Sequence, residues 1–232
     1  MNKKTLELYI ESNPFEQLNK IVFYMLLKEI SSLKYKPGQK LNVSQISSDL
    51  QISRTPITEA LKMLVEYGLV EDNLDKQGYY VSVLSRKEAI DIHKARKALE
   101  SMAAFICAEN GSCPNIDKME ELAYRFVDFF KKEKYEIVDA VDVPFHKLII
   151  ESSGNKYIQR CYKLLERQLY RYQCYSMSNV MNDNINPISN ELEYQHISIV
   201  NAIKLHLPNL ARQSMEQHID SCMMLLNGYM RN

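Results

Sequence analysis

The sequence predicts a mainly α-helical chain with two domains, and three observations support this fold class. Apolar residues recur every three or four positions over most of the 232 residues, which is the helical period. The clearest strand patterns are two short apolar or aromatic runs near residues 69–84. Ser85 and Glu88 then form a capping-box pair that starts a new helix. We therefore expect an N-terminal arm over residues 1–13, a small domain over 14–84 and an all-helical domain over 85–232.

The composition limits the classes of function. The chain has 29 basic and 29 acidic side chains, which argues against a protein that coats nucleic acid non-specifically. The five cysteines are odd in number and form no Cys-x-x-Cys pair, so we expect reduced, structural thiols and neither a zinc knuckle nor a disulfide framework. No stretch approaches the roughly 18 apolar residues of a membrane span. We expect a cytoplasmic protein without a membrane partner.

The small domain has the element order of a winged helix-turn-helix. A Pro-Gly turn separates its first helix from a second, short helix, and a tight turn then leads into a third. A polar loop with Gly78 near its tip separates two short strands, which predicts a two-stranded wing. In chain order, the predicted elements are helices over residues 15–33, 44–50 and 55–67 and strands over 69–71 and 79–84.

The third of these helices, from about Thr55 to Tyr67, has one apolar and one polar face. Ser53 or Thr55 can cap it, and Pro56 fits its first turn. The polar face offers donors suited to phosphates and base edges in a major groove, although an ordinary surface helix is the alternative interpretation. The candidate DNA-binding residues on this helix, on the helix before it and in the wing are Ser44, Ser53, Arg54, Thr55, Thr58, Lys62, Lys76, Gln77 and Gly78.

Four segments resemble the winged-helix domain of GntR-type transcriptional regulators. They are residues 36–41 (KPGQKL), 53–61 (SRTPITEAL), 68–70 (GLV) and 78–81 (GYYV). The resemblance covers roughly residues 14–84 and implies sequence-specific binding to an operator. Thr58 stands where the family usually has Arg. This departure implies one weakened DNA contact and a different operator sequence.

The large domain has the pattern of six helices and no convincing strand. Gly, Pro and Asn residues separate its apolar stripes. An antiparallel bundle of about 145 residues is long enough to bury its own core. The helices are predicted near residues 86–109, 114–132, 136–152, 154–181, 188–206 and 208–230.

Three histidines and one aspartate of this domain are predicted to point into the bundle. Asp142 and His146 share one apolar helix face, while His196 and His218 lie on the apolar stripes of two other helices. A buried carboxylate is costly unless it is neutralised, and a divalent cation binds both carboxylate oxygen and neutral imidazole. The four residues predict a site for zinc, nickel, iron or manganese, with a structural hydrogen-bonded cluster as the alternative.

The same domain resembles the ligand-binding helical (FCD) domain of the FadR-type branch of GntR regulators. The resemblance rests on residues 96–100 (RKALE), 142–146 (DVPFH), 154–155 (GN) and the spacing of His196 and His218. It implies that the Asp-x-x-x-His pair and the two later histidines hold a divalent metal at the floor of a cavity. It also implies a carboxylate or sugar-acid effector. Pro144 requires that the helix kink or begin close to Asp142.

Arg96 lies on the apolar stripe of its helix, so it needs an anionic partner. Glu100, one turn on, would provide a structural ion pair. The alternative is that Arg96 binds the carboxylate of an effector through two parallel hydrogen bonds. We take Arg96, Glu100 and Asn155 as candidate effector-binding residues. His93 is expected on the outward side of the same helix.

These observations predict a ligand-responsive, DNA-binding transcriptional regulator that acts as a repressor and is not an enzyme. We expect a homodimer that binds double-stranded operator DNA and a small carboxylate-type effector, with a divalent metal in the helical domain. The alternative is a metal-dependent enzyme or ligand-binding protein that uses the Asp/His site. In that case the winged helix would be a protein-interaction module.

Overall fold

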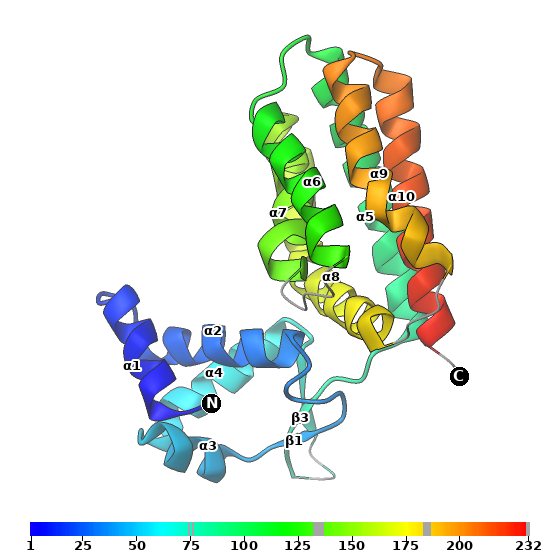
Figure 1. Ribbon diagram of the computed structural model, residues 1–232. Coiled ribbons are helices and arrows are strands. Elements are labelled where there is room, and N and C mark those ends of the chain that lie inside the picture. The colour runs from blue at the N-terminus through cyan, green and yellow to red at the C-terminus, as the bar shows by residue number, and fades with distance from the viewer. Residues whose placement is uncertain (74, 76, 132–136, 183–186, 231–232) are drawn as a thin grey trace. The chain divides into compact units, whose positions relative to one another are not determined.

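The computed structural model divides into two compact units, Met1–Leu84 and Ser85–Asn232 (Figure 1). It describes residues 1–73, 75, 77–131, 137–182 and 187–230. The mainly helical fold class is confirmed, with a small sheet in the first unit and a helical bundle as the second. None of the described helices is long and apolar enough to cross a membrane.

The first unit is a helical domain with a three-stranded sheet. The helices of the predicted helix-turn-helix are present, and α4 buries its apolar face through Ile57, Ala60, Leu61 and Leu64. This face packs against α2 in a single core. In chain order the elements are α1 (Lys3–Ser12), α2 (Leu18–Ser31), β1 (Lys40–Leu41), α3 (Val43–Leu50), α4 (Arg54–Glu66), β2 (Val70–Asn73) and β3 (Gly78–Val81).

The sheet has one strand more than the predicted two-stranded wing. Its order is β1-β3-β2 with antiparallel pairs, and Lys40 and Leu41 of β1 pair with Tyr80 and Tyr79. Two residues are too few to show the alternating pattern of a strand, so β1 could not be predicted from the sequence. Gly38 turns the chain with φ of 77° and donates its N–H to the Val81 carbonyl at 2.8 Å.

The N-terminal residues form a helix, where the sequence analysis expected a loosely held arm. Asn2 caps α1 by accepting a hydrogen bond from the Thr5 N–H at 2.9 Å. Leu6 joins the core of the unit with 3% of its surface exposed. Leu6 and the partly buried Tyr9 on an otherwise polar helix were too weak a periodic signal to predict this packing.

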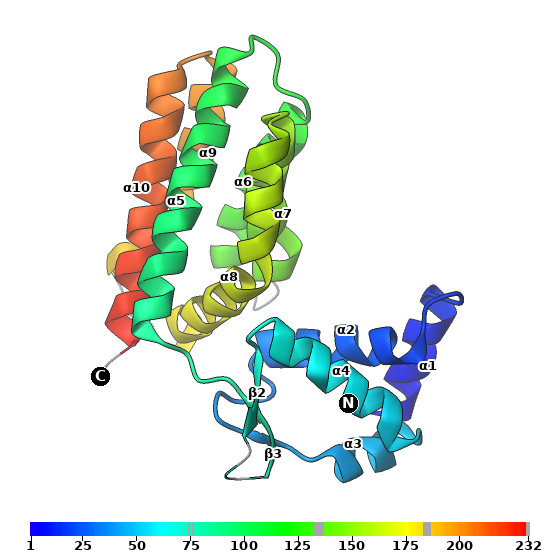
Figure 2. The ribbon, with the colours of Figure 1, turned by 180° about the vertical axis from the view of Figure 1, so that it is seen from behind.

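Among its described residues, the second unit has the six predicted helices, which are labelled in Figures 1 and 2, and one additional π-helical turn, η1. The helix α5 packs against α7, α8, α9 and α10, and α9 also packs against α6. The predicted helix ends at residues 132 and 136 lie outside the described residues. The elements are α5 (Arg86–Glu109), α6 (Ile116–Lys131), η1 (Val138–Asp142), α7 (Val143–Ser152), α8 (Lys156–Asn182), α9 (Pro187–Lys204) and α10 (Pro208–Tyr229).

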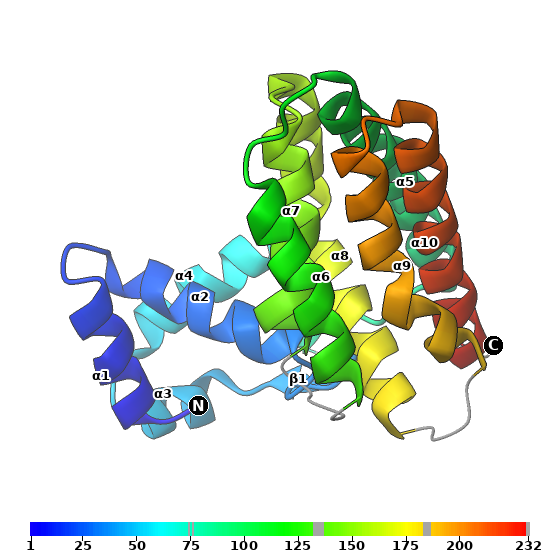
Figure 3. The same ribbon diagram turned by 45° about the horizontal axis from the view of Figure 1, so that its top comes forward.

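The junction between η1 and α7 resolves the position of Pro144. The helix α7 begins at Val143, so Pro144 occupies its first turn, where a missing N–H breaks no helical hydrogen bond. Asp142 is the last residue of η1 and lies directly before α7. Figure 3 shows α7, α9 and α10 within one bundle. The helix therefore begins next to Asp142, as the proline required.

The packing of α1 gives the first testable prediction. Leu6→Ala should lower the free energy of unfolding of the first unit by about 2 to 5 kcal/mol, because it leaves a cavity in a packed core. Leu8→Ala is the matched control, since 55% of the Leu8 surface is exposed in the same helix. Urea denaturation of the two variants measures the difference. Equal, near-zero effects would mean that α1 does not pack as described.

Candidate metal centre and DNA-binding surface

The structure brings together the four residues that the sequence singled out as metal ligands. Asp142 from η1, His146 from α7, His196 from α9 and His218 from α10 are all buried. Each offers one donor atom, and these four atoms lie within 4.8 Å of one another. Phe126 and Phe145 pack against the His196 ring and make the surroundings apolar.

The three imidazole rings point their Nε2 atoms toward one another. The Nε2 atom of His146 lies 3.3 Å from that of His196 and 3.2 Å from that of His218. Asp142 Oδ1 lies 3.6 Å from His146 Nε2 and 3.5 Å from His196 Nε2. Two ligands bound tetrahedrally to one ion at about 2.0 to 2.1 Å are separated by about 3.3 Å. These four separations therefore match the spacing of ligands that share one cation.

In two of these rings, the partner of the outer nitrogen, Nδ1, determines which ring nitrogen carries the proton. His146 Nδ1 lies 2.7 Å from Glu100 Oε2, so this nitrogen carries hydrogen toward the carboxylate. His218 Nδ1 donates to Gln195 Oε1 at 3.0 Å, and the Gln195 amide in turn donates to Ser221 Oγ. A neutral imidazole has one N–H, so each of these two rings, when neutral, has a bare lone pair on Nε2.

Bare lone pairs 3.2 Å apart repel each other unless a positive charge lies between or beside them. A proton on His146 Nε2 would satisfy one neighbouring imidazole, but two imidazoles face this atom. A divalent cation accepts a lone pair from every ring at once. The donor set therefore fits a metal better than it fits a hydrogen-bonded cluster.

The ionisation states of Asp142, His196 and His218 agree with ligands ready to bind a cation. Burial raises the pKa of Asp142, but the neighbouring His146 and His196 rings more than offset this, so the net pKa is lowered. Burial lowers the pKa of His196 to about 3 and that of His218 well below its usual value. The pKa of His146 is raised, because Glu100 outweighs the effect of burial. Asp142 is thus ionised, and His196 and His218 are neutral.

Gln173 orients the aspartate. Its side-chain amide donates to Asp142 Oδ2 at 2.8 Å, which leaves Oδ1 directed toward the imidazoles. Gln173 on α8 thus contacts Asp142, and Glu100 on α5 contacts His146, each on the side of the ligand that faces away from the other three. Such outer partners are typical of metal sites, where they fix ligand orientation.

Arg96 and Glu100 form the ion pair that the sequence left as one of two alternatives. Arg96 Nε lies 2.7 Å from Glu100 Oε1, and both side chains are buried. Burial raises the pKa of Glu100, but Arg96 and His146 lower it to about 2. Within the described part of the chain, Arg96 Nη2 has no hydrogen-bond partner. The guanidinium therefore has spare donor capacity in a buried position.

A small cavity of about 30 Å³ lies beside the four-residue cluster. It connects the cluster to Arg96 and to the long helix α8. Asn155 is not among its lining residues, since its Oδ1 caps α8 by accepting from the N–H groups of Tyr157 and Ile158. The cavity is lined by His93, Arg96, Phe126, Asp142, Tyr172, Gln173, Ser176, Met177, His218, Cys222 and Leu225.

The prediction that His93 lies on the outward side of its helix is wrong. The side chain is buried, and its Nδ1 donates to the Ala89 carbonyl at 2.8 Å. Burial and the nearby Arg96 lower its pKa to about 4. The helix α5 packs on several sides, so its buried face is wider than the stripe from which the prediction was made.

Tyr172 joins this cavity to the first turn of α5. Its side chain is fully buried, and its hydroxyl accepts from the Ser85 N–H at 3.1 Å and donates to Glu88 Oε2 at 2.6 Å. Tyr172 also precedes Gln173, which holds Asp142. Neither contact of the Tyr172 hydroxyl could be predicted from the sequence, because Ser85 and Glu88 lie 87 and 84 positions away.

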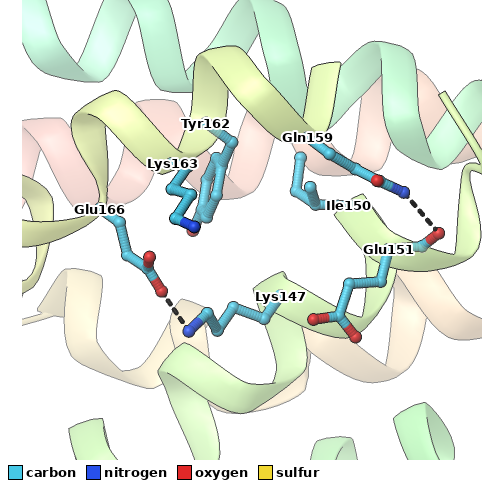
Figure 4. A pocket seen from close by; sticks show the side chains of 7 residues that line it. All are labelled: Lys147, Ile150, Glu151, Gln159, Tyr162, Lys163 and Glu166. Atoms are coloured by element: carbon cyan, nitrogen blue, oxygen red, sulfur yellow. Dashed lines mark hydrogen bonds and ion pairs between the residues drawn. The ribbon is translucent and has the colours of Figure 1, made fainter. Parts of the chain in front are cut away.

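A larger hollow lies on the outside of the bundle between α7 and α8 (Figure 4). Its volume is about 290 Å³, and an ion pair joins Lys147 and Glu166 at one side. Its two lysines and two glutamates balance, so this hollow has no net charge to select an anion. The lining residues are Lys147, Ile150, Glu151, Gln159, Tyr162, Lys163 and Glu166.

The candidate DNA-binding residues on α4 form a polar surface of the first unit. Arg54, Thr55 and Lys62 are exposed on α4, and Ser53 is exposed at its N-terminus. The Thr58 hydroxyl already donates its hydrogen to the Arg54 carbonyl at 3.0 Å, so its oxygen remains as an acceptor. These positions present a cation and several hydroxyl groups at the start of one helix, which suits a major groove.

The remaining candidates lie on α3 and in the wing. Ser44 is exposed in the first turn of α3, and Gln77 is exposed between β2 and β3. Gly78 has φ of 142°, and a Cβ there would lie 3.2 Å from the Lys40 side chain, so the position requires glycine. Lys76 lies outside the described residues.

Comparison with known families decides the identity of both units. The model of the bacterial regulatory proteins of the gntR family matches residues 18–81, and the model of the FCD domain matches residues 91–221. The chain belongs to the GntR family, in the branch with an FCD domain. This GntR protein is therefore a ligand-responsive, DNA-binding transcriptional regulator.

Individual relatives agree with this assignment. The gluconate operon transcriptional repressor of Bacillus subtilis is 25% identical to this GntR regulator over 199 residues, which span 86% of this chain and 81% of that one. The regulator YdhC of Bacillus subtilis is 27% identical over 140 residues, which span 59% of this chain and 62% of YdhC, less than two thirds of its length. The structure of Escherichia coli McbR/YncC has the same fold, with a TM-score of 0.75 at 20% identity over 94% of this chain and all of that one.

Proposed function

We propose that this GntR regulator represses transcription as a homodimer, and that a small organic acid bound beside a divalent metal releases it from its operator. The observation that carries the proposal is the set of three imidazole nitrogens and one carboxylate oxygen with the spacing of shared ligands. We also propose that the centre binds its ligand without turnover and that the regulator acts in the cytoplasm, where operator DNA lies. Turnover of a bound acid would favour the competing metal-dependent enzyme.

Asp142, His146, His196 and His218 would hold the metal. Nitrogen and carboxylate donors suit zinc, nickel, iron or manganese. The bound cation would supply positive charge that neutralises Asp142 and an open position for an oxygen of the effector. Glu100 and Gln173 keep the ligands oriented, because each contacts the outer side of one ligand.

The proposed effector is a carboxylate. Arg96 lines the cavity with Asp142 and His218, and its Nη2 is a buried donor without a partner among the described residues. A carboxylate would accept a charge-assisted hydrogen bond from it. A relative that controls a gluconate operon is consistent with a sugar acid as the ligand class. In this proposal Glu100 positions Arg96 and His146, and Asn155 remains a candidate contact only for an effector that reaches the start of α8.

The size of the cavity supports a change of shape on binding. A volume of about 30 Å³ holds water, whereas an organic acid needs several times that space. The effector must therefore bind a more open arrangement of the bundle. A ligand shifts such an equilibrium only if it binds one arrangement more tightly than the other. Enlargement next to Tyr172 would disturb its bonds to Ser85 and Glu88, at the point where the chain enters the helical unit.

The proposed DNA complex has α4 in the major groove. Ser53, Arg54, Thr55, Thr58 and Lys62 would contact phosphates and base edges, with Ser44, Lys76, Gln77 and Gly78 at the flanking backbone and the wing. One recognition helix reads only a few base pairs, so a dimer on a pseudo-palindromic operator gives adequate specificity. We propose that the helical unit provides the dimer contacts.

The metal proposal predicts about one divalent ion per chain. Replacement of His196 and His218 together by alanine should abolish metal binding, because two of four ligands are lost. His206→Ala is the control, since His206 is exposed at the end of α9. Elemental analysis and zinc titration of folded variants, verified by circular dichroism, measure the effect. Folded wild-type protein that binds no divalent metal would refute the proposal.

The DNA proposal predicts that Arg54→Ala weakens operator binding by about 1 to 3 kcal/mol, because it removes a charged donor from α4. Lys118→Ala removes the same charge from an exposed position of the helical unit and serves as the control. Fluorescence anisotropy at one fixed salt concentration measures both, on DNA selected by the wild-type protein. If both variants bind equally well, Arg54 does not contact the operator.

The role of Tyr172 gives a prediction about signal transfer. Tyr172→Phe keeps the ring that lines the cavity but removes the hydroxyl bonds to Ser85 and Glu88. The variant should bind metal and operator normally while losing the effector-dependent change in operator affinity, typically about 1 to 3 kcal/mol. Operator titrations with and without the acid identified by screening measure this coupling. Tyr157→Phe, exposed on α8, is the control, and retention of full coupling in Tyr172→Phe would reject the role.

A further inference from the structure

A sulfur atom lies next to the four proposed ligands of the metal centre. Cys222 follows His218 by four positions on α10, so the two side chains lie on the same face of that helix. The Cys222 Sγ atom lies 3.7 Å from His218 Nε2, which is the nitrogen that faces the His146 ring. The thiol is free of any disulfide. A fifth donor atom is therefore in contact with the cluster.

The distance between these two atoms suits a nitrogen and a sulfur bound to one ion. Zinc binds histidine nitrogen at about 2.0 to 2.1 Å and thiolate sulfur at about 2.3 Å, so in a tetrahedral arrangement the two atoms lie about 3.6 Å apart. The observed 3.7 Å is close to this value. The sulfur is not one of the four donor atoms that lie within 4.8 Å of one another. Cys222 therefore extends the donor set on one side, next to His218.

The side on which Cys222 lies is the side of the cavity. Cys222 lines this cavity together with Asp142, His218 and Arg96. The Nη2 atom of Arg96 is buried there without a hydrogen-bond partner among the described residues, so the cavity already has one polar group that awaits a ligand. In the proposed function, an effector oxygen reaches the ion from this cavity. The thiol thus lies where the open position of the ion is expected.

We propose that Cys222 is a fifth metal ligand, whose thiolate occupies the open position of the ion until an effector oxygen takes that position. The inference rests on the metal centre of the proposed function and adds a residue to it. The thiolate is the form of cysteine that binds metals, so the thiol releases its proton to water as the sulfur–metal bond forms. Cys222 would then depart from the expectation that all five thiols are structural.

A sulfur donor narrows the choice of metal. Carboxylate oxygen suits manganese as well as zinc, whereas thiolate favours zinc and other soft ions. With three nitrogens, one oxygen and one sulfur, the centre should therefore prefer zinc to manganese. Cobalt(II) has the charge of zinc and binds the same donors, and its absorption spectrum differs between sites with and without a thiolate ligand. Cobalt is thus the probe that reports directly on Cys222.

The test titrates cobalt(II) chloride into the full-length, metal-free protein, with a thiol-free reductant and no effector. The wild type should bind about one equivalent and show ligand-field bands in the visible range together with a thiolate-to-cobalt charge-transfer band in the near ultraviolet. Cys222→Ser and Cys222→Ala should keep the ligand-field bands, because the other four ligands remain. Both variants should lose the charge-transfer band, because their site has no sulfur.

Cys174→Ser is the matched control, because Cys174 is a partly buried thiol on α8 that does not line the cavity. It should keep both kinds of band. Ligand-field bands alone in the wild type, or a charge-transfer band that persists in Cys222→Ser, would remove Cys222 from the ligands and leave the metal centre in place. Absence of cobalt binding to the folded wild type would overturn the metal centre and this inference with it. Circular dichroism verifies that each variant is folded.

Discussion

The helical unit depends on a buried chain of charges that runs from Arg96 through Glu100 to His146. Burial of any one of these charged groups alone would cost free energy, and the opposite charge of its neighbour offsets that cost. Glu100 is the central member, since one oxygen faces the guanidinium and the other faces the imidazole. The chain fixes the proton of His146 on the outer nitrogen and thereby frees the inner nitrogen. The donor character of His146 follows from this one carboxylate.

Much of this arrangement could be predicted from the sequence, because helical spacing reports directly on which side of a helix a residue lies. The inward direction of Asp142, His146, His196 and His218 followed from their apolar neighbours, and the structure brings the four together. The position of Pro144 likewise required the helix start that is observed at Val143. The six helices of the second unit were predicted for the same reason, since Gly and Pro interrupt strong periodic stripes.

Other features depended on contacts between distant segments, which helical periodicity does not predict. Nothing near Gln173 in the sequence indicates that its amide faces Asp142, 31 positions away. The burial of His93 depends on how many helices surround α5, and the packing of α1 rests on Leu6 and the partly buried Tyr9. The strand β1 exists because its partner β3 holds it in place. The sequence thus reveals which faces are apolar, and only the fold reveals what each face meets.

The π-helical turn η1 separates the winding of the chain before it from that of α7. A π turn holds one residue more than an α turn, so removal of a single residue between Val138 and Asp142 restores regular winding. Each residue of an α-helix corresponds to a rotation of about 100°, so the deletion would rotate the residues before the turn relative to α7. Asp142 has helical dihedral angles and directly precedes Val143, so it would keep its direction relative to His146. A change in chain length alone can therefore redirect the chain that leads into the centre and leave this pair of ligands in place.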